Sequence, residues 1–412
     1  MVYIKREIEN EVFKWIDSKE IIAIRGTRQC GKTTFLKKIS ETLIQKRVSK
    51  ENIHLISFED DFEKEKFEKN PKEYISYHIK DNSIKHYFLL DEVQYVKNAG
   101  KLLKLLYDET KNIKIIITGS STLDLNEIGS YLVGRILLFE MYPFSFSEFL
   151  ESKDAKLFNY YTKRRIRITD KKIVLGEEPV YLDSLNKLLR EYILFGGYPA
   201  IVLEKDTEKK KFLLKNLFLT YIEKDIVKIY GSKYKQRILD LIKYLSSINS
   251  GIINYNEIAG IISLYDKEVK EILHILEETY VIRLIKPFHK NLSTELKKNP
   301  RVYFIDTGLR NFMANRFDIS DNEYGQLLEN FVLSNIRQEK VNYWRTTAKA
   351  EVDFVINEKT PIESKMNVKL TRSFRSFIET YNPARAFLVN LNKLDKGKIK
   401  RTNVFIVPYC LI

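Results

Sequence analysis

The segment Gly26-Thr-Arg-Gln-Cys-Gly31-Lys32-Thr33-Thr34 matches every fixed position of the phosphate-binding pattern G-x-x-x-x-G-K-[ST]. It lies between an apolar run at residues 21–24 and a helical pattern that starts at Phe35. At such a turn, glycines let consecutive backbone N–H groups point inward, and the positive end of the helix dipole strengthens this anion site. The sequence predicts that the whole loop binds nucleotide: Gly26, Thr27, Arg28, Gln29, Cys30, Gly31, Lys32, Thr33 and Thr34.

Two residues of this loop have specific expected roles. Lys32 is expected to reach the β- and γ-phosphates, and Thr33 to offer its hydroxyl to Mg²⁺. A second apolar run, residues 87–90, ends in Asp91 and Glu92. We expect Asp91 to hold Mg²⁺ through a bound water, and Glu92 to orient and deprotonate the attacking water. Together the two motifs predict hydrolysis as well as binding.

A third apolar run, residues 113–117, is followed by the hydroxyl residues Thr118, Ser120 and Ser121. If this strand is inserted between the other two, as in the additional-strand class of P-loop ATPases, one of these hydroxyls faces the γ-phosphate. The sequence leaves open which one, and Ser120 is included among the catalytic candidates. Arg135 is a further candidate, either for transition-state charge on its own or a neighbour's nucleotide or for a structural role, as a helix cap or as the partner of Glu148.

The motifs GTRQCGKTT, LLDEVQ, IIITGSS, LVGR and YPFSFSEF together resemble the AAA-type ATP-binding proteins of bacteria and archaea, whose C-terminal half is a domain of unknown function. The resemblance continues through residues 195–200, 221–225, 303–308 and 351–354, so it covers nearly the whole chain. It implies an α/β P-loop fold of the additional-strand type, a winged-helix middle and an α+β nuclease-like end. It also implies ATP and Mg²⁺ as cofactors.

The expected domains follow from this resemblance and from the sequence pattern. They are an ATPase domain at 1–150, a connector and helical segment at 151–232, a winged-helix-like domain at 233–310 and a nuclease-like domain at 320–412. Within the third, the pattern predicts three helices and then two strands, residues 280–285 and 301–305. The third helix carries Lys267 and Lys270 but also four glutamates, so sequence-specific DNA reading stands beside a protein-contact or purely structural use.

The last hundred residues contain a second candidate site. Asp353 lies in one strand, Glu363 and Lys365 lie on one face of the next, and Glu329 lies on a preceding helix. Two carboxylates and a lysine at a hairpin can bind Mg²⁺ and activate water for phosphodiester cleavage, and the arrangement resembles the PD-(D/E)xK nuclease core. Glu351 is expected to point away from Asp353. The alternative is a β-hairpin with ordinary surface charges.

Composition limits the class of protein. The 412 residues include 70 Lys and Arg against 55 Asp and Glu, which gives a net charge of +15. This charge favours binding to polyanions such as DNA. A lysine-rich composition can also be a general property of the proteins of one organism. Cys30 and Cys410 make no disulfide framework, and no apolar run approaches a membrane span, so we expect a cytoplasmic protein with no membrane partner.

Three functions are therefore considered. The first is ATP hydrolysis coupled to DNA contacts. The second is an ATP-dependent switch that docks a protein partner or a second copy of the chain, and the third is an ATP-gated DNA nuclease.

Overall fold

The computed structural model describes residues 3–119, 128–176, 179–223, 227, 231, 234–288 and 298–412. The chain divides into two compact units: unit 1 is Met1–Pro143 with Glu278–Tyr280, and unit 2 is Phe144–Glu277 with Val281–Ile412. Unit 1 thus ends at Pro143, and the boundary expected at residue 150 lies within the first helix of unit 2. The helix that follows Pro143 packs on other helices of unit 2, which is why it belongs there.

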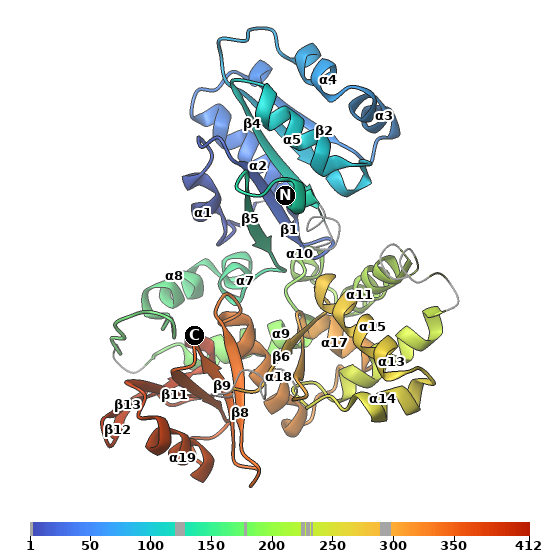
Figure 1. The fold of residues 1–412 in the computed structure, drawn as a ribbon. Coiled ribbons are helices and arrows are strands. Elements are labelled where there is room, and N and C mark those ends of the chain that lie inside the picture. Colours follow the sequence, from blue (N-terminus) through green and yellow to red (C-terminus); the bar gives the residue numbers. More distant parts are fainter. Residues whose placement is uncertain are drawn as a thin grey trace. The chain divides into compact units, whose positions relative to one another are not determined.

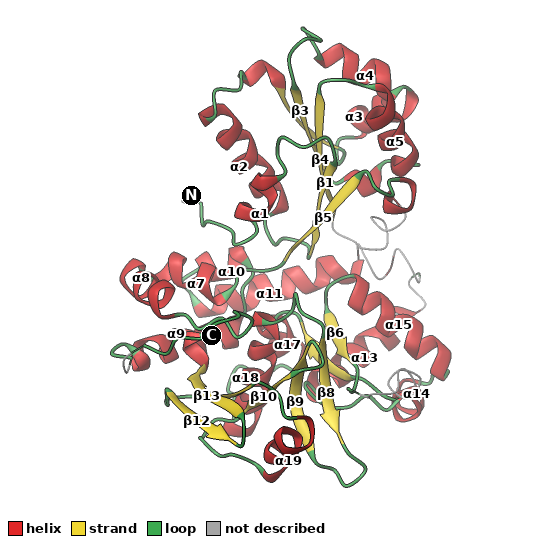
Figure 2. Cartoon of the chain, turned by 60° about the vertical axis from the view of Figure 1, so that its left-hand side comes forward, coloured by secondary structure: helices red, strands yellow, loops and turns green. Residues whose placement is uncertain are grey.

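Unit 1 is a parallel β-sheet covered by helices on both faces (Figures 1 and 2). Its elements are α1 (Glu9–Lys14), β1 (Ile21–Gly26), α2 (Lys32–Gln45), β2 (Ile53–Ser57), α3 (Asp61–Lys69), α4 (Pro71–His78), β3 (His86–Asp91), α5 (Ala99–Glu109), β4 (Ile113–Gly119) and β5 (Ile136–Met141). The strand order is β2-β3-β4-β1-β5, with all neighbours parallel. This order confirms the predicted insertion of β4 between the strand of the phosphate loop and the strand of Asp91.

The sheet of unit 1 has an apolar cluster on each face. On one face, Ile22 and Ile24 of β1 pack with Phe35 and Ile39 of α2, and on the other, Ile21 and Ala23 pack with residues of α3, α4 and α5. Figure 2 shows α1 and α2 on one side of the strands and α3 to α5 on the other. Burial on both faces explains why the strands read as continuous apolar runs.

Unit 2 begins with helices. These are α7 (Phe146–Lys153), α8 (Ala155–Arg164), α9 (Leu182–Phe195), α10 (Pro199–Leu203), α11 (Thr207–Tyr221), α13 (Lys235–Ser247), α14 (Tyr255–Ile262) and α15 (Asp266–Glu278). Residues 155–164, in the part of the chain expected to be a connector and helical segment, form the regular helix α8. Asp154 caps α8 by accepting from two backbone N–H groups, and Leu157 and Tyr161, four residues apart, form its buried face.

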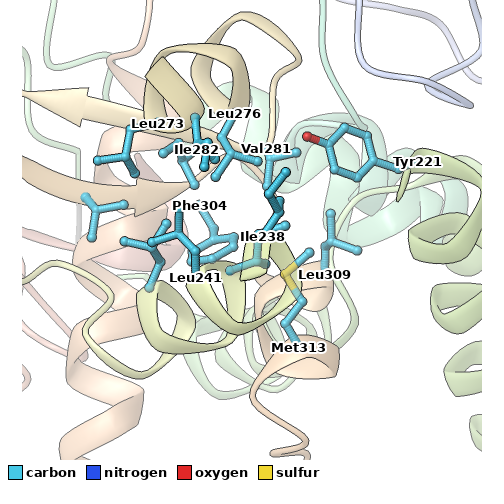
Figure 3. Packing of buried hydrophobic residues seen from close by; sticks show 14 of the residues in the cluster. Tyr221, Ile238, Leu241, Leu273, Leu276, Val281, Ile282, Phe304, Leu309 and Met313 are labelled. Atoms are coloured by element: carbon cyan, nitrogen blue, oxygen red, sulfur yellow. The ribbon is translucent and has the colours of Figure 1, made fainter. Parts of the chain in front are cut away.

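After α15 come two antiparallel strands, β6 (Ile282–Ile285) and β7 (Arg301–Phe304), in the order of three helices and two strands that the pattern predicted. Their core is continuous with that of the helices. Figure 3 shows Ile238 and Leu241 of α13, Leu276 of α15 and Phe304 of β7 pointing into one cluster. The short helix α17 (Thr307–Met313) closes the cluster with Leu309 and Met313.

The end of unit 2 is a six-stranded mixed sheet with the order β12-β13-β11-β10-β9-β8. Its elements are α18 (Asp321–Asn335), β8 (Val341–Arg345), β9 (Glu351–Ile356), β10 (Thr360–Ser364), α19 (Arg372–Tyr381), β11 (Arg385–Asn390), β12 (Asp395–Ile399) and β13 (Thr402–Pro408). Helix α19 buries Phe374, Phe377 and Ile378 against the sheet. Helix α18 contacts β10. Within the described residues, no helix is both long and apolar enough to cross a bilayer.

Two motifs noted in the sequence, residues 195–200 and 303–308, meet in one tight joint. The Asp306 carboxylate caps α17 at the backbone N–H of Leu309 (2.9 Å) and also accepts from the N–H of Gly197 (2.7 Å). Burial raises the pKa of Asp306 to about 6, although its backbone hydrogen bonds act in the opposite direction. A Cβ added at Gly308 would lie 2.0 Å from the backbone oxygen of Phe195. The joint therefore requires glycine.

Gly308→Ala is expected to destabilise unit 2 by about 2–3 kcal/mol, because the added methyl group meets backbone rather than a movable side chain. Urea unfolding followed by the fluorescence of the buried Trp344 measures this effect. The matched control is Gly260→Ala in α14, where an added Cβ meets nothing within 4 Å. That substitution is expected to stabilise by about 0.5–1 kcal/mol. Equal effects at the two positions would contradict the close approach.

Candidate nucleotide-binding site and a second acidic site

The loop between β1 and α2 has the backbone shape of an anion site. Gln29 (φ 56°) and Gly31 (φ 100°) adopt left-handed conformations, and α2 starts directly after Gly31. A Cβ added at Gly26 would lie 1.8 Å from the backbone oxygen of Met141, so β5 leaves no room for a side chain there. The glycines let the loop turn tightly around the first N–H groups of α2, which have no partner within the helix.

Lys32 is held inside this loop. Its side chain is buried, and its Nζ donates to the backbone oxygens of Gly26 (3.1 Å) and Thr27 (2.9 Å). An ammonium group has three donors and no acceptor. The loop's own carbonyl groups therefore aim the positive charge of Lys32 at the centre of the loop.

The sheet brings three polar residues from three segments together. Asp91, at the end of β3, is buried, and its Oδ2 accepts from the hydroxyl of Thr33 (2.6 Å). Its Oδ1 accepts from the hydroxyl of Thr118, near the end of β4. Because β1, β3 and β4 are parallel, their carboxyl ends meet at one edge of the sheet. Carboxylate and hydroxyl oxygens are ligands that suit Mg²⁺, so Thr33 and Asp91 fit the predicted ion.

Glu92 leaves β3 in a left-handed conformation, with φ 57° and ψ 46°. Its backbone N–H donates to the hydroxyl oxygen of Thr118 (3.1 Å), and its carboxylate accepts from the side-chain amide of Gln94. Thr118 thus contacts both members of the acidic pair. Of the three hydroxyl candidates in the sequence, Thr118 is the one the structure places at Asp91, while Ser120 and Ser121 lie outside the described residues.

Arg135 is not brought to the phosphate loop. It precedes β5, whose first residue pairs with Ile21, whereas the loop begins at Gly26 beside Met141 at the other end of the strands. A strand of this length separates the two ends by about 16 Å. Arg135 instead pairs with Asp108 (2.8 Å), and Glu148 closes a capping box with Ser145. The arginine therefore has a local ionic partner other than the expected Glu148.

Arg6 is a further residue of the site, and no sequence motif marks it. Its guanidinium is buried and donates to the backbone oxygens of Cys30 (2.7 Å) and Tyr142 (2.6 Å), and Glu9 accepts from its backbone N–H (2.7 Å). Arg6 therefore ties the phosphate loop to the end of β5. No local pattern marks an arginine as the partner of residues so distant in the chain.

The structure brings Asp353, Glu363 and Lys365 of the second candidate site close together. Lys365 Nζ lies 3.4 Å from Asp353 Oδ2 and 3.2 Å from Glu363 Oε1. The backbone N–H of Ser364 donates to Asp353 (2.9 Å), and the hydroxyl of Thr371 donates to Glu363 (3.2 Å). Asp353 and Glu363 are both buried.

Burial dominates the electrostatics of this site. Desolvation, followed by the nearby charge of Asp353, raises the pKa of Glu363 to about 8 and that of Glu329 to about 7. The pKa of Lys365 is also raised, because the two carboxylates beside it outweigh its own desolvation. The cluster thus holds more acidic groups than its cations neutralise.

Two features of this site differ from the prediction or were missed by it. The expectation that Glu351 points away from Asp353 is wrong, because residues two apart in a strand share a face. Both contact Arg301 of β7, which the sequence analysis did not connect with the site: Arg301 Nη2 lies 3.0 Å from Glu351 and Nη1 lies 3.7 Å from Asp353. Arg301 also pairs with Glu329 (3.2 Å). In the described part of the chain, no three acidic, His or Cys side chains are arranged to hold a metal ion.

Comparisons with known proteins agree with the geometry of unit 1. Residues 18–150 match the AAA domain family, residues 186–320 match a domain of unknown function (DUF8612), and residues 324–411 match a second one (DUF4143). A parallel sheet with a phosphate loop after β1, an acidic pair after β3 and β4 between them defines a P-loop NTPase of the AAA type.

The uncharacterized protein MJ1544 of Methanocaldococcus jannaschii is 31% identical over 364 residues, which cover 86% of this chain and 75% of that protein. The chain belongs to the family of MJ1544. An uncharacterized protein of Haemophilus influenzae is 25% identical over 84% of this chain and 81% of its own length. Among solved structures, a DNA replication initiation factor is 16% identical, with a TM-score of 0.30, over 65% of this chain and 73% of that one. That similarity is too weak to support a functional conclusion.

Proposed function

We propose that this chain is a Mg²⁺-dependent ATPase that couples hydrolysis to contacts with DNA. The observation that carries the ATPase is the contact of Asp91 with both Thr33 and Thr118, beside the loop that holds Lys32. The AAA domain match supports it. In this proposal the loop N–H groups and Lys32 bind the phosphates.

The roles that we propose for the other residues of the site follow from their positions. Thr33 and Asp91 would hold Mg²⁺, which when bound withdraws charge from the phosphates. Glu92 orients the attacking water and accepts its proton. Thr118 is a positioning residue, since its hydroxyl contacts both the carboxylate of Asp91 and the backbone of Glu92. Arg6 keeps the loop in shape through the oxygen of Cys30.

The DNA contact is supported by a basic edge on the C-terminal sheet. Strand β12 is an edge strand, and four exposed cations on it and after it form no ion pair with any described residue: Lys396, Lys398, Lys400 and Arg401. Exposed, unneutralised cations of this kind suit the phosphate backbone. In α15, by contrast, Lys270 pairs with Asp266 (2.6 Å) and Lys267 with Glu271 (4.0 Å). The winged-helix-like segment is therefore the weaker candidate for DNA.

The test is ATP turnover with and without duplex DNA, together with DNA affinity across a series of salt concentrations. The double variant Lys398→Glu/Arg401→Glu is expected to weaken DNA binding and to reduce the slope of log affinity against log salt by about 2, one for each lost phosphate contact. Its matched control, Lys267→Glu/Lys270→Glu in α15, is expected to bind like the wild type.

The results separate the candidate functions. Turnover that rises with DNA in the wild type and not in the β12 variant supports the proposal. Turnover and binding that are indifferent to DNA at low salt would reject the DNA contact and favour the switch that docks a protein partner.

A further inference from the structure

We propose that Arg301 occupies the cation position of the acidic cluster in unit 2, so that this cluster accepts a divalent metal only when Arg301 is removed. Arg301 is 5% exposed, and its guanidinium reaches three carboxylates: Glu329 (3.2 Å), Glu351 (3.0 Å) and Asp353 (3.7 Å). A planar guanidinium presents several donors at once, which lets one side chain face several carboxylates. This inference is independent of the proposed ATPase.

The backbone around Arg301 holds it in place. Asn330 of α18 brackets Phe304, accepting from its N–H (3.0 Å) and donating to its oxygen (2.7 Å). The hydroxyl of Tyr303 donates to Glu329. Strand β7, which carries Arg301, is thus fastened to the helix that carries Glu329.

A second observation, besides the acidic side chains, indicates a position for a cation. The Oε2 atom of Glu363 is buried and has no hydrogen-bond partner among the described residues, while its Oε1 contacts Lys365. Glu363 is 2% exposed and shares Lys365 with Asp353, so its free oxygen belongs to the same cluster. A buried carboxylate oxygen without a partner is costly, and a metal ion is one group that would satisfy it.

The number of charged groups in the cluster also indicates that Arg301 occupies a position for a cation. Four carboxyl groups, Glu329, Glu351, Asp353 and Glu363, face the cationic side chains of Arg301 and Lys365, and the partly exposed Glu351 also lies 3.8 Å from Arg345. Removal of Arg301 takes one positive charge from the cluster and frees oxygens of three carboxyl groups. Removing one partner from a buried ion network also leaves uncompensated charge, which a divalent cation relieves.

The first experiment is calorimetric titration of the full-length protein with Mn²⁺. The wild type is expected to show no binding in unit 2, and Arg301→Gln is expected to bind one additional Mn²⁺ with a Kd at least about tenfold below the weakest Kd that the titration detects, because a positive charge has left the cluster. Adding Asp353→Asn to Arg301→Gln is expected to abolish that binding, which assigns it to this site rather than to the phosphate loop.

A second variant guards against a failure of Arg301→Gln to fold. Adding Glu351→Gln to Arg301→Gln removes the carboxylate that loses its contact with Arg301 Nη2, at a side chain that is 44% exposed, and leaves Glu329, Asp353 and Glu363 in place. The thermal unfolding midpoint of this double variant is expected to rise by about 2–4 °C with Mn²⁺, while the midpoints of the wild type and of Glu351→Gln alone, which both keep Arg301, do not change. The proposal is overturned if the wild type binds Mn²⁺ as tightly as Arg301→Gln in an Asp353-dependent way. It is equally overturned if neither variant responds to Mn²⁺.

Discussion

Glu92→Gln is expected to lower kcat for ATP by about 10²–10⁴-fold and to leave ATP affinity within a factor of about two, because the amide keeps the shape of the side chain but cannot accept the proton of the attacking water. The backbone N–H that contacts Thr118 is unaffected by the change, and the new amide oxygen still accepts from Gln94. Steady-state turnover and titration with a fluorescent ATP analogue measure the two quantities separately.

The control for Glu92→Gln is Glu41→Gln on α2, a carboxylate that is 63% exposed and pairs with Lys38 at 3.6 Å. It makes the same chemical change outside the site, so wild-type turnover is expected. Turnover by Glu92→Gln equal to that of the wild type would show that Glu92 is not the base and that other groups activate the attacking water.

Lys32→Ala is expected to weaken ATP binding by at least about 100-fold, or about 3 kcal/mol, because charge-assisted contacts with two phosphates are lost. In the structure the Lys32 ammonium already lies in the loop, on the oxygens of Gly26 and Thr27. Lys32→Ala therefore removes a positive charge that the folded loop already holds in position. The same fluorescent titration gives the affinity, and thermal unfolding with added ATP gives an independent measure of binding.

Lys37→Ala is the matched control, since Lys37 lies on the exposed side of the same helix. It is expected to bind ATP like the wild type. If Lys32→Ala folds and keeps wild-type affinity, the loop does not bind phosphate in the proposed way. Loss of binding in Lys32→Ala together with retained binding in Glu92→Gln would separate the binding role from the catalytic one.

The strands and loop of unit 1 could be predicted because their determinants are local. A buried parallel strand is a continuous apolar run, and the phosphate loop needs particular residues within nine positions, Gly26 to Thr34. Asp91 and Thr118 could be expected near the loop for a similar reason, since parallel strands end at the same edge. Helix α8 was missed because its buried face is only two residues wide, Leu157 and Tyr161.

Contacts between distant segments could not be predicted in this way. Arg6 binds the oxygens of Cys30 and Tyr142, and no periodicity relates the three positions. Residues 195–200 and 303–308 are likewise joined only in the tertiary structure, where Asp306 accepts from the N–H of Gly197. Arg135 was a catalytic candidate because an arginine at the end of this domain could stabilise transition-state charge, but the strand that follows it places it at the opposite end from the phosphate loop.

By itself, the sequence determined the chemistry that is available: a phosphate loop with Lys32, an acidic pair at Asp91 and Glu92, and a second group of acids with Lys365. Spacing along one strand or loop is enough for that, because neighbours in sequence are neighbours in space. Only the tertiary structure decided which cation meets which acid. Arg301 reaches Glu329 and Asp353 because β7 is fastened to α18, and such pairing depends on how separate elements pack rather than on the order of residues.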